Sequence, residues 1–340
     1  MMARQQRVEY PVANVARQRA CERLAPARAA MYRAGVRIGV NLLNFGPGVS
    51  PDSLVGWTQL AETLGYHFVM ISDHVAMTPD VVARYPAPFY DPFVTLAWLA
   101  RATSRVELGT TVVILPYRHP LHTARLAANI DRLSGGRFIF GVGVGWARQE
   151  FEALGVPFER RGAMSDDYLA AIKIAWTTDP ASHAGPFVSF RDVQTGPPPV
   201  RSPHPPVWVG GASDAAMRRA VRLGDAWHPI RIRLPWLRDT GLPRLRAIAE
   251  KEGRPLPALC PRIRLRITDA PMADDQRIAG EGRLDQVRAD LAALAALGAS
   301  HVLLDTYTDD VEATRHHETA WRMLTLLAEQ VLDLAGESLR

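Results

Sequence analysis

The chain has 340 residues, of which 47% are hydrophobic and 22% are charged, the composition of a globular protein with a sizeable core. No stretch approaches the roughly 20 consecutive apolar residues of a membrane-spanning helix. The net charge is +5, and nearly all the positive charge is arginine, since Lys173 and Lys251 are the only lysines. The basic residues are spread along the chain, which argues against a nucleic-acid-binding surface.

Cysteine usage and the N-terminal segment bear on localisation. Cys21 and Cys260 make neither a disulfide framework nor a metal site and are compatible with the cytoplasm, where we expect the protein. Residues 1–34 are rich in arginine and lack the apolar core of a secretory signal. We expect a flexible extension there, or an early start codon with Met31 as the true start, and one domain over residues 35–340. The abundant arginine, alanine and proline indicate a GC-rich, actinobacterial genome.

Strand-like and helix-like patterns alternate through the first half of the chain. Ser50 and Pro51 predict a helix start, as do Asp91 and Pro92, because a capping side chain precedes proline in the first turn. The first four predicted strands cover residues 36–43, 67–72, 106–115 and 137–145, and the helices between them cover residues 51–64, 92–102 and 119–133.

The same alternation continues to the C-terminus. Helical patterns are predicted over residues 147–154, 163–177, 214–223, 235–251, 284–297 and 312–334, and strands over residues 205–211, 225–230, 262–268 and 301–307. Most of the strands are continuous apolar runs, as expected for parallel strands that are covered on both faces.

Eight strands, each followed by a helix, are typical of a (β/α)8 TIM barrel, an α/β fold. A doubly wound sheet is the alternative, but it would have fewer strands. Residues 178–204 interrupt the alternation with many prolines and a short strand pair around residues 186–190. We predict an insertion there, between strands four and five, which either forms an active-site wall or is a plain solvent loop.

Residues 136–146 read GRFIFGVGVGW and place Gly141, Gly143 and Gly145 at alternate positions near a strand end. This spacing is not the G-x-G-x-x-G dinucleotide fingerprint. Alternate strand residues face the same way, so three side chains are missing along one line. Either a flat ring or phosphate approaches the bare backbone, or a neighbouring strand packs closely. Because barrels bind ligands at this end of their strands, we favour a ligand role for Gly143 and Gly145.

Two further strand ends carry candidate site residues. Gly210 and Gly211 precede a helix that Ser213 or Asp214 caps, which indicates either an anion site or a plain turn. His74 follows the second strand and could move protons near neutral pH, although a structural histidine is the commoner case.

The remaining histidines do not predict a metal centre. His119 and His122 are three residues apart at a helix start, and the sequence contains no H-E-x-x-H. No G-x-S-x-G nucleophile motif or Walker sequence is present either. We therefore expect no metal.

Four segments share their order and spacing with a known family. They are ISDHV (71–75), LGTTVVILPYRHP (108–120), ARLAANIDRLSGGRFIFGVGVGWARQEF (124–151) and PPVWVGGASDAAMRRAVRLGDAWHP (205–229). On these segments the chain, from about Val36 to Leu334, resembles the luciferase-like monooxygenase superfamily. More narrowly, it resembles the branch that uses the deazaflavin coenzyme F-420.

The resemblance implies roles for residues near the second and third strands. Asp73 would lie near the cofactor and His74 near its hydride-accepting carbon. A non-prolyl cis peptide bond between Thr111 and Val112 would form a bulge behind the ring.

The resemblance also implies roles for the fourth and fifth strands. The segment from Gly143 through Gly145 to Trp146 would line the cofactor, and Gly210 and Gly211 would hold its phosphate. Trp146 stands where the sugar-phosphate dehydrogenases of this branch carry a glutamate, so we do not expect that activity. We expect Trp146 to stack on the ring or the substrate, with a core tryptophan as the alternative.

These observations predict a coenzyme F-420-dependent oxidoreductase, a reductase or dehydrogenase. Hydride would pass between deazaflavin C5 and a small organic substrate while His74 donates or accepts the proton. The alternatives are an FMN-dependent monooxygenase that uses reduced flavin and O2, and a non-catalytic flavin- or deazaflavin-binding protein. Asn41, Trp146 and His228, at three strand ends, are candidate substrate contacts. No nucleic-acid or membrane partner is expected, and a homodimer, common among similar proteins, is left open.

Overall fold

Eight parallel strand positions form a ring in the computed structural model, which describes residues 35–275 and 277–340. In ring order the strands are β1 (Arg37–Asn41), β2 (Phe68–Ile71), β3 (Glu107–Thr110), β5 (Phe138–Gly143), β8 (Val207–Gly210), β9 (Ala226–His228), β10 with β11 (Ala258–Leu259 and Arg262–Arg264) and β14 (His301–Asp305). The predicted extension over residues 1–34, with Cys21 and Met31, lies outside the described residues.

The ring closes through the seventh strand position. β10 pairs with β9, and β11 pairs with β14, which in turn pairs with β1. Across the break, the amide of Cys260 donates to the Trp227 carbonyl at 2.9 Å, and the amide of Ser300 donates to the Leu259 carbonyl at 3.0 Å. The predicted (β/α)8 barrel is therefore confirmed.

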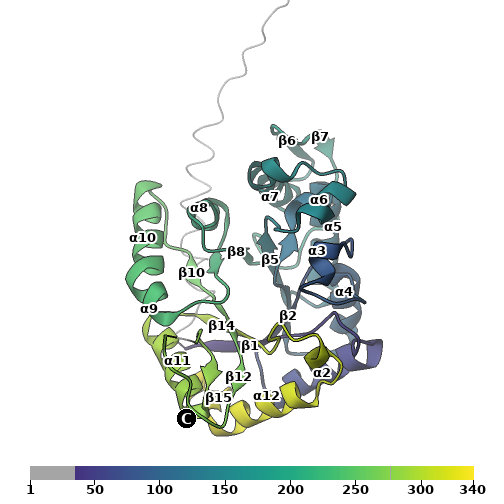
Figure 1. The fold of residues 1–340 in the computed structure, drawn as a ribbon. Helices are drawn as coiled ribbons and strands as arrows, with labels where there is room; N and C mark the ends of the chain where they lie inside the picture. The colour runs from purple at the N-terminus through teal and green to yellow at the C-terminus, as the bar shows by residue number, and fades with distance from the viewer. Residues whose placement is uncertain (1–34, 276) are drawn as a thin grey trace, which may run out of the picture. The chain divides into compact units, whose positions relative to one another are not determined.

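One long helix follows each strand position on the outside of the ring (Figure 1). These helices are α2 (Pro51–Leu64), α4 (Pro92–Ala102), α5 (Pro120–Leu133), α7 (Arg161–Thr177), α8 (Asp214–Leu223), α10 (Leu242–Lys251), α11 (Leu284–Ala296) and α12 (Glu318–Gln330). The Ser50 hydroxyl accepts from the Ser53 amide at 3.1 Å, and the Asp91 carboxylate accepts from the Phe93 amide at 2.9 Å. Both caps lie where the sequence predicts them. None of the described helices is long and apolar enough to cross a membrane.

The interior of the ring is filled by large side chains from non-adjacent strands. Phe68 of β2 and Trp208 of β8 lie 5.5 Å apart between ring centroids, and Trp208 lies 5.0 Å from His301 of β14. Strands that are not neighbours can touch only through the interior of the ring. At the N-terminal end of the strands, Glu107 receives ion pairs from Arg37 and Arg201. Barrels of this fold bind their ligands at the opposite end, where the strands end.

The predicted insertion contains a hairpin, β6 (Ala181–Ala184) and β7 (Ser189–Val193), on either side of residues 185–188. Asp167 of α7 anchors it by accepting from His183 Nε2 at 2.7 Å, the Phe187 amide at 2.8 Å and the Val188 amide at 3.0 Å. The insertion is thus fixed to the barrel wall, and its role as part of an active site stays a prediction.

Several predicted boundaries differ from the structure. The third strand is split into β3 and β4 (Val113–Ile114), and the seventh begins at Ala258 rather than at residue 262. The last helix begins at Glu318 rather than at residue 312. The preceding residues pack on the turn at residues 46–48 instead, where His317 Nε2 bonds to the Gly48 carbonyl at 3.0 Å. Tertiary contacts thus override the local helical pattern.

Candidate functional site

A buried carboxylate holds the imidazole of His74 just past the end of β2. His74 Nδ1 donates to Glu150 Oε2 at 2.6 Å, and the side chains of His74 and Glu150 are 4% and 0% exposed. Glu150 lies on the short helix α6 (Arg148–Ala153) and also accepts from the Val75 amide at 2.6 Å and the Tyr117 hydroxyl at 2.8 Å. With the proton fixed on Nδ1, Nε2 is the ring nitrogen that remains for exchange with a substrate.

The surroundings of Glu150 keep its carboxylate ionised. Burial acts to raise the pKa of Glu150, but the hydrogen bond and charge of His74, with the bonds from Val75 and Tyr117, outweigh it and lower the pKa. Burial and the neighbouring Glu150 raise the pKa of Tyr117, so the phenol stays neutral and donates. Sequence reasoning assigned no role to either residue. The only local signal was the glutamate that ends the G-W-x-x-x-E run at residues 145–150.

Aromatic side chains surround the His74 ring. Tyr85 and Phe89 each lie 5.3 Å from it between ring centroids, and Trp146 lies 5.8 Å from it. Trp146 is 39% exposed, and the Arg84 guanidinium lies 5.2 Å from its ring centroid. Trp146 is therefore not a core residue, whereas its stacking on a ring or a substrate stays a prediction.

The peptide bond between Thr111 and Val112 is cis, and a buried polar network holds it. Arg262 Nη1 donates to the Thr111 carbonyl at 3.0 Å, and Asp305 pairs with Arg262 Nη2 at 2.7 Å. The Thr111 hydroxyl lies 2.9 Å from His228 Nε2. Val112, which follows, is half-buried and lies over the end of β5.

Asn41 and His228, the predicted substrate contacts, are 0% and 2% exposed. Asn41 Nδ2 donates to Asp305 Oδ1 at 2.9 Å. Burial lowers the pKa of His228 to about 4, so the ring is neutral, donates from Nδ1 to the Cys260 carbonyl and accepts at Nε2 from Thr111. His228 thus contacts Thr111 directly, and Asn41 is linked to it through Asp305 and Arg262. Contact of either residue with a substrate stays a prediction.

Asp73 is likewise enclosed, with a side chain that is 0% exposed. Its carboxylate accepts from the Ile114 amide at 2.9 Å and from the Arg118 guanidinium at 2.7 and 2.8 Å. These bonds tie the end of β2 to the segment that follows the cis bond. This geometry makes Asp73 a positioning residue, and a direct contact with a cofactor stays a prediction.

Gly141 and Gly143 of β5, and Gly145 just past its end, each lie against a neighbouring group of the protein. A Cβ on Gly141 would overlap the Thr110 carbonyl oxygen, and one on Gly143 would lie 2.5 Å from Val112 Cγ2. Gly145 has φ +79°, and a Cβ there would lie 2.7 Å from the Phe151 ring. At these three positions the space that a side chain would need is occupied by neighbouring groups of the protein, as in the alternative of close packing. Contact between a cofactor and the backbone of Gly143 or Gly145 stays a prediction.

The end of β8 forms the predicted turn into α8. Gly211 has φ +107°, and its carbonyl accepts from Trp227 Nε1 at 2.7 Å. Ser213, rather than Asp214, caps the helix by accepting from the Ala216 amide at 3.3 Å. Gly210 lies beside Val112, whose Cγ1 would be 3.0 Å from a Cβ at that position. Phosphate binding by Gly210 and Gly211 stays a prediction.

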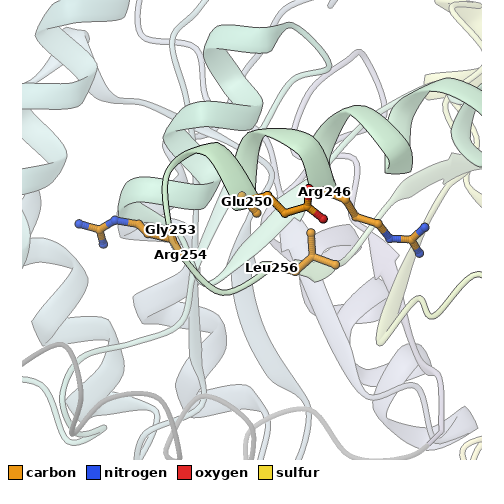
Figure 2. Close-up of a pocket in the computed structure, with 6 residues that line it drawn as sticks. Arg246, Glu250, Gly253, Arg254 and Leu256 are labelled. Carbon is orange, nitrogen blue, oxygen red and sulfur yellow. The ribbon is translucent and has the colours of Figure 1, made fainter.

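A separate surface pocket lies at the C-terminal end of α10 (Figure 2). Its lining residues are Arg246, Ala249, Glu250, Gly253, Arg254 and Leu256. Because α10 leads into the N-terminal end of β10, this pocket lies at the opposite end of the barrel from His74.

The family model for luciferase-like monooxygenases matches residues 30–333. The chain belongs to this family. Among its relatives is the oxygenase component of a flavin-dependent trigonelline monooxygenase from Acinetobacter baylyi, 32% identical over 175 residues. That match covers 51% of this chain and 46% of the relative.

Solved structures with the same fold include enzymes of two cofactor types. One is an F420-dependent secondary alcohol dehydrogenase in complex with an F420-acetone adduct, with a TM-score of 0.69, 16% identity and coverage of 87% of this chain and 98% of that one. Another is the oxygenating constituent of 3,6-diketocamphane monooxygenase from Pseudomonas putida in complex with FMN, with a TM-score of 0.69, 16% identity and coverage of 89% and 99%.

Proposed function

We propose that the chain is a coenzyme F-420-dependent oxidoreductase in which His74 moves the proton that accompanies hydride transfer. The observation that carries the proposal is the buried His74–Glu150 pair at the end of β2. Reduction of a carbonyl or oxidation of an alcohol needs a proton donor or acceptor beside the reacting oxygen. A carboxylate-oriented imidazole among aromatic side chains is suited to that task.

The residues at this end of the barrel fit a planar redox cofactor in two respects. Val112 presents a half-buried apolar side chain directly after the cis bond, and Trp146 presents an exposed indole beside His74. A bound deazaflavin would supply the carbon that gives or takes the hydride. Val112 and Trp146 would hold its ring.

Glu150 and the aromatic residues define what His74 does in this reaction. Because Glu150 holds Nδ1–H, a neutral His74 accepts a proton at Nε2 from an alcohol, and a protonated His74 donates one to a carbonyl. Tyr85 and Phe89, which pack on the imidazole, would exclude water from the reacting oxygen.

A second candidate is a monooxygenase that uses reduced FMN and O2. It is favoured by the 32% identity to the oxygenase component of a flavin-dependent monooxygenase. The same histidine and apolar surroundings would serve a flavin ring, so the cofactor itself must be tested.

The test is a titration of purified protein with F-420 and with FMN, followed by tryptophan fluorescence because Trp146 is exposed at the site. We expect tight F-420 binding and F-420-coupled turnover in a screen of alcohols, ketones, enones and imines. His74→Ala should keep F-420 binding and lose about 100-fold or more of the turnover. His122→Ala, at an exposed histidine on α5, is the control and should match the wild type.

Three results would count against the proposal. Tight FMN binding without F-420 binding would favour the monooxygenase. Cofactor binding without turnover of any substrate class would favour a non-catalytic binding protein. Unchanged turnover in His74→Ala would remove His74 from the proton step.

A further inference from the structure

Two arginines from neighbouring strand positions hold one carboxylate beside the candidate site. Arg231 follows β9, Arg264 ends β11, and Asp309 lies four residues past the end of β14. Arg231 Nη2 pairs with Asp309 Oδ1, and Arg264 Nη2 pairs with Asp309 Oδ2 at 2.7 Å. Each carboxylate oxygen thus has its own guanidinium, and arginine is a residue well suited to carboxylate recognition.

The backbone at this contact is strained. Arg231 has φ +54° and Asp309 has φ +65°, both in the left-handed region that residues other than glycine seldom adopt. The side chains of Arg231 and Asp309 are 36% and 37% exposed, and ion pairs as exposed as this one contribute little to stability. Stability alone therefore does not explain the arrangement, and backbone strain of this kind clusters at ligand-binding sites.

A chain of ring contacts links the arginine pair to His74. Tyr307, two residues before Asp309, lies 5.8 Å from Tyr85 between ring centroids, and Tyr85 lies 5.3 Å from His74. Burial acts to lower the pKa of Arg231, but the hydrogen bond and charge of Asp309 outweigh it and raise the pKa, and Tyr85 is near enough to add to that rise. The guanidinium and the aromatic residues around His74 therefore border the same region.

The charge of this cluster depends on where Asp309 lies. Arg264 has a second partner, Glu281, at 3.3 Å, so the two arginines, Glu281 and Asp309 together are neutral. If the Asp309 carboxylate moves away, Arg231, Arg264 and Glu281 together carry one positive charge. Residues 309–313 are all exposed, so the loop that carries Asp309 can move without opening the core.

We propose that Arg231 and Arg264 form a carboxylate subsite for the substrate, and that Asp309 is an internal counter-ion which the substrate carboxylate displaces. The substrate class is a small aromatic carboxylic acid, with its ring against Tyr85 and Trp146. The inference rests on the proposed function for its location next to His74. It goes beyond that function by naming the group that the substrate carries.

The test measures benzoate binding by titration calorimetry at low ionic strength, with benzyl alcohol as the uncharged probe. Asp309→Asn removes the internal competitor and should bind benzoate about fivefold more tightly than the wild type, as expected for loss of an exposed ion pair. Adding Arg231→Gln should abolish the gain, whereas Arg231→Lys should keep part of it. Benzyl alcohol should bind all the variants equally.

Arg238→Gln is the matched control, because Arg238 is an exposed arginine that pairs with Asp239 rather than with Asp309. It should leave benzoate affinity unchanged. Should Asp309→Asn fail to fold, as judged by circular dichroism, Arg231→Gln and Arg231→Lys in the wild-type background give the same comparison.

Equal benzoate affinity in the wild type, Asp309→Asn and the Arg231 variants would overturn the proposal. A gain of equal size for benzyl alcohol would also overturn it, because it would mean a wider opening rather than a charge site. The assay contains no redox cofactor. A failure of the benzoate test is therefore distinct from a failure of F-420 binding. Loss of F-420 binding would not change the benzoate affinities.

Discussion

At the scale of single residues, the relation between His74 and Glu150 governs the proposed chemistry. Glu150 accepts four hydrogen bonds, from His74, Tyr117 and the amides of Val75 and Ala76. Its lowered pKa means that the charge is fully present above the ordinary carboxyl pKa and is lost only as the pH falls through the lower folded value. The orientation of His74 should therefore persist throughout the neutral range.

Replacing Glu150 tests this positioning role. Glu150→Gln keeps the size of the side chain but removes its charge, so we expect kcat to fall about 100-fold while KM and cofactor affinity change little. Glu152→Gln, on the exposed side of the same helix, is the control. An unchanged kcat would make Glu150 a purely structural residue.

At the scale of elements, the packing of β5 against the residues after the cis bond shapes the end of the barrel. β5 carries glycine at positions 141 and 143, and Val112 occupies the space that a side chain at Gly143 would need. A second glycine, Gly210 of β8, borders the same side chain. The glycines thus determine where Val112 lies, and Val112 in turn is the residue expected behind a cofactor ring.

A double-mutant cycle tests this packing. Gly143→Ala should lower the free energy of unfolding by about 1–3 kcal/mol, because the new methyl would lie 2.5 Å from Val112 Cγ2. Adding Val112→Ala should recover most of that loss, which chemical denaturation can measure. Gly162→Ala, on α7 where the nearest atom would be 3.8 Å away, should be neutral or slightly stabilising. Additive losses for Gly143 and Val112 would show that the two residues do not share this space.

At the scale of the whole molecule, two buried histidines make the fold sensitive to acid. Burial lowers the pKa of His228 to about 4 and that of His301 to about 3, whereas both would titrate near 6.5 in the unfolded chain. Between the folded and unfolded pKa values, the two histidines are protonated in the unfolded state and neutral in the folded state. The free energy of unfolding is therefore highest above about pH 6.5 and falls as the pH drops toward 4.

Denaturation at pH 7 and pH 5 measures this effect. His228 alone should account for about 2 kcal/mol of the difference between the two pH values. His228→Gln, although less stable at pH 7, should show a pH dependence smaller by about that amount. His122→Gln should retain the full dependence, because His122 is exposed. Identical pH dependence in the wild type and His228→Gln would mean that the buried imidazole is already protonated.

Local features of the sequence determined the elements and their order. The caps at Ser50 and Asp91 depend on side chains within three residues of the amides that they bind, so they are visible without a fold. The alternation of apolar strands with helical periods predicted the barrel. The spacing of the ISDHV and GVGVGW runs indicated the family.

Only the tertiary structure decided which side chains meet. His74 and Glu150 are 76 residues apart, Arg262 reaches Thr111 across 151 residues, and no local pattern encodes such contacts. The same limit explains the glycines of β5, because whether a missing side chain leaves room for a ligand or for Val112 depends on the neighbouring strand. A sequence specifies the backbone through interactions over a few residues, whereas a site consists of groups that only the closed barrel brings together.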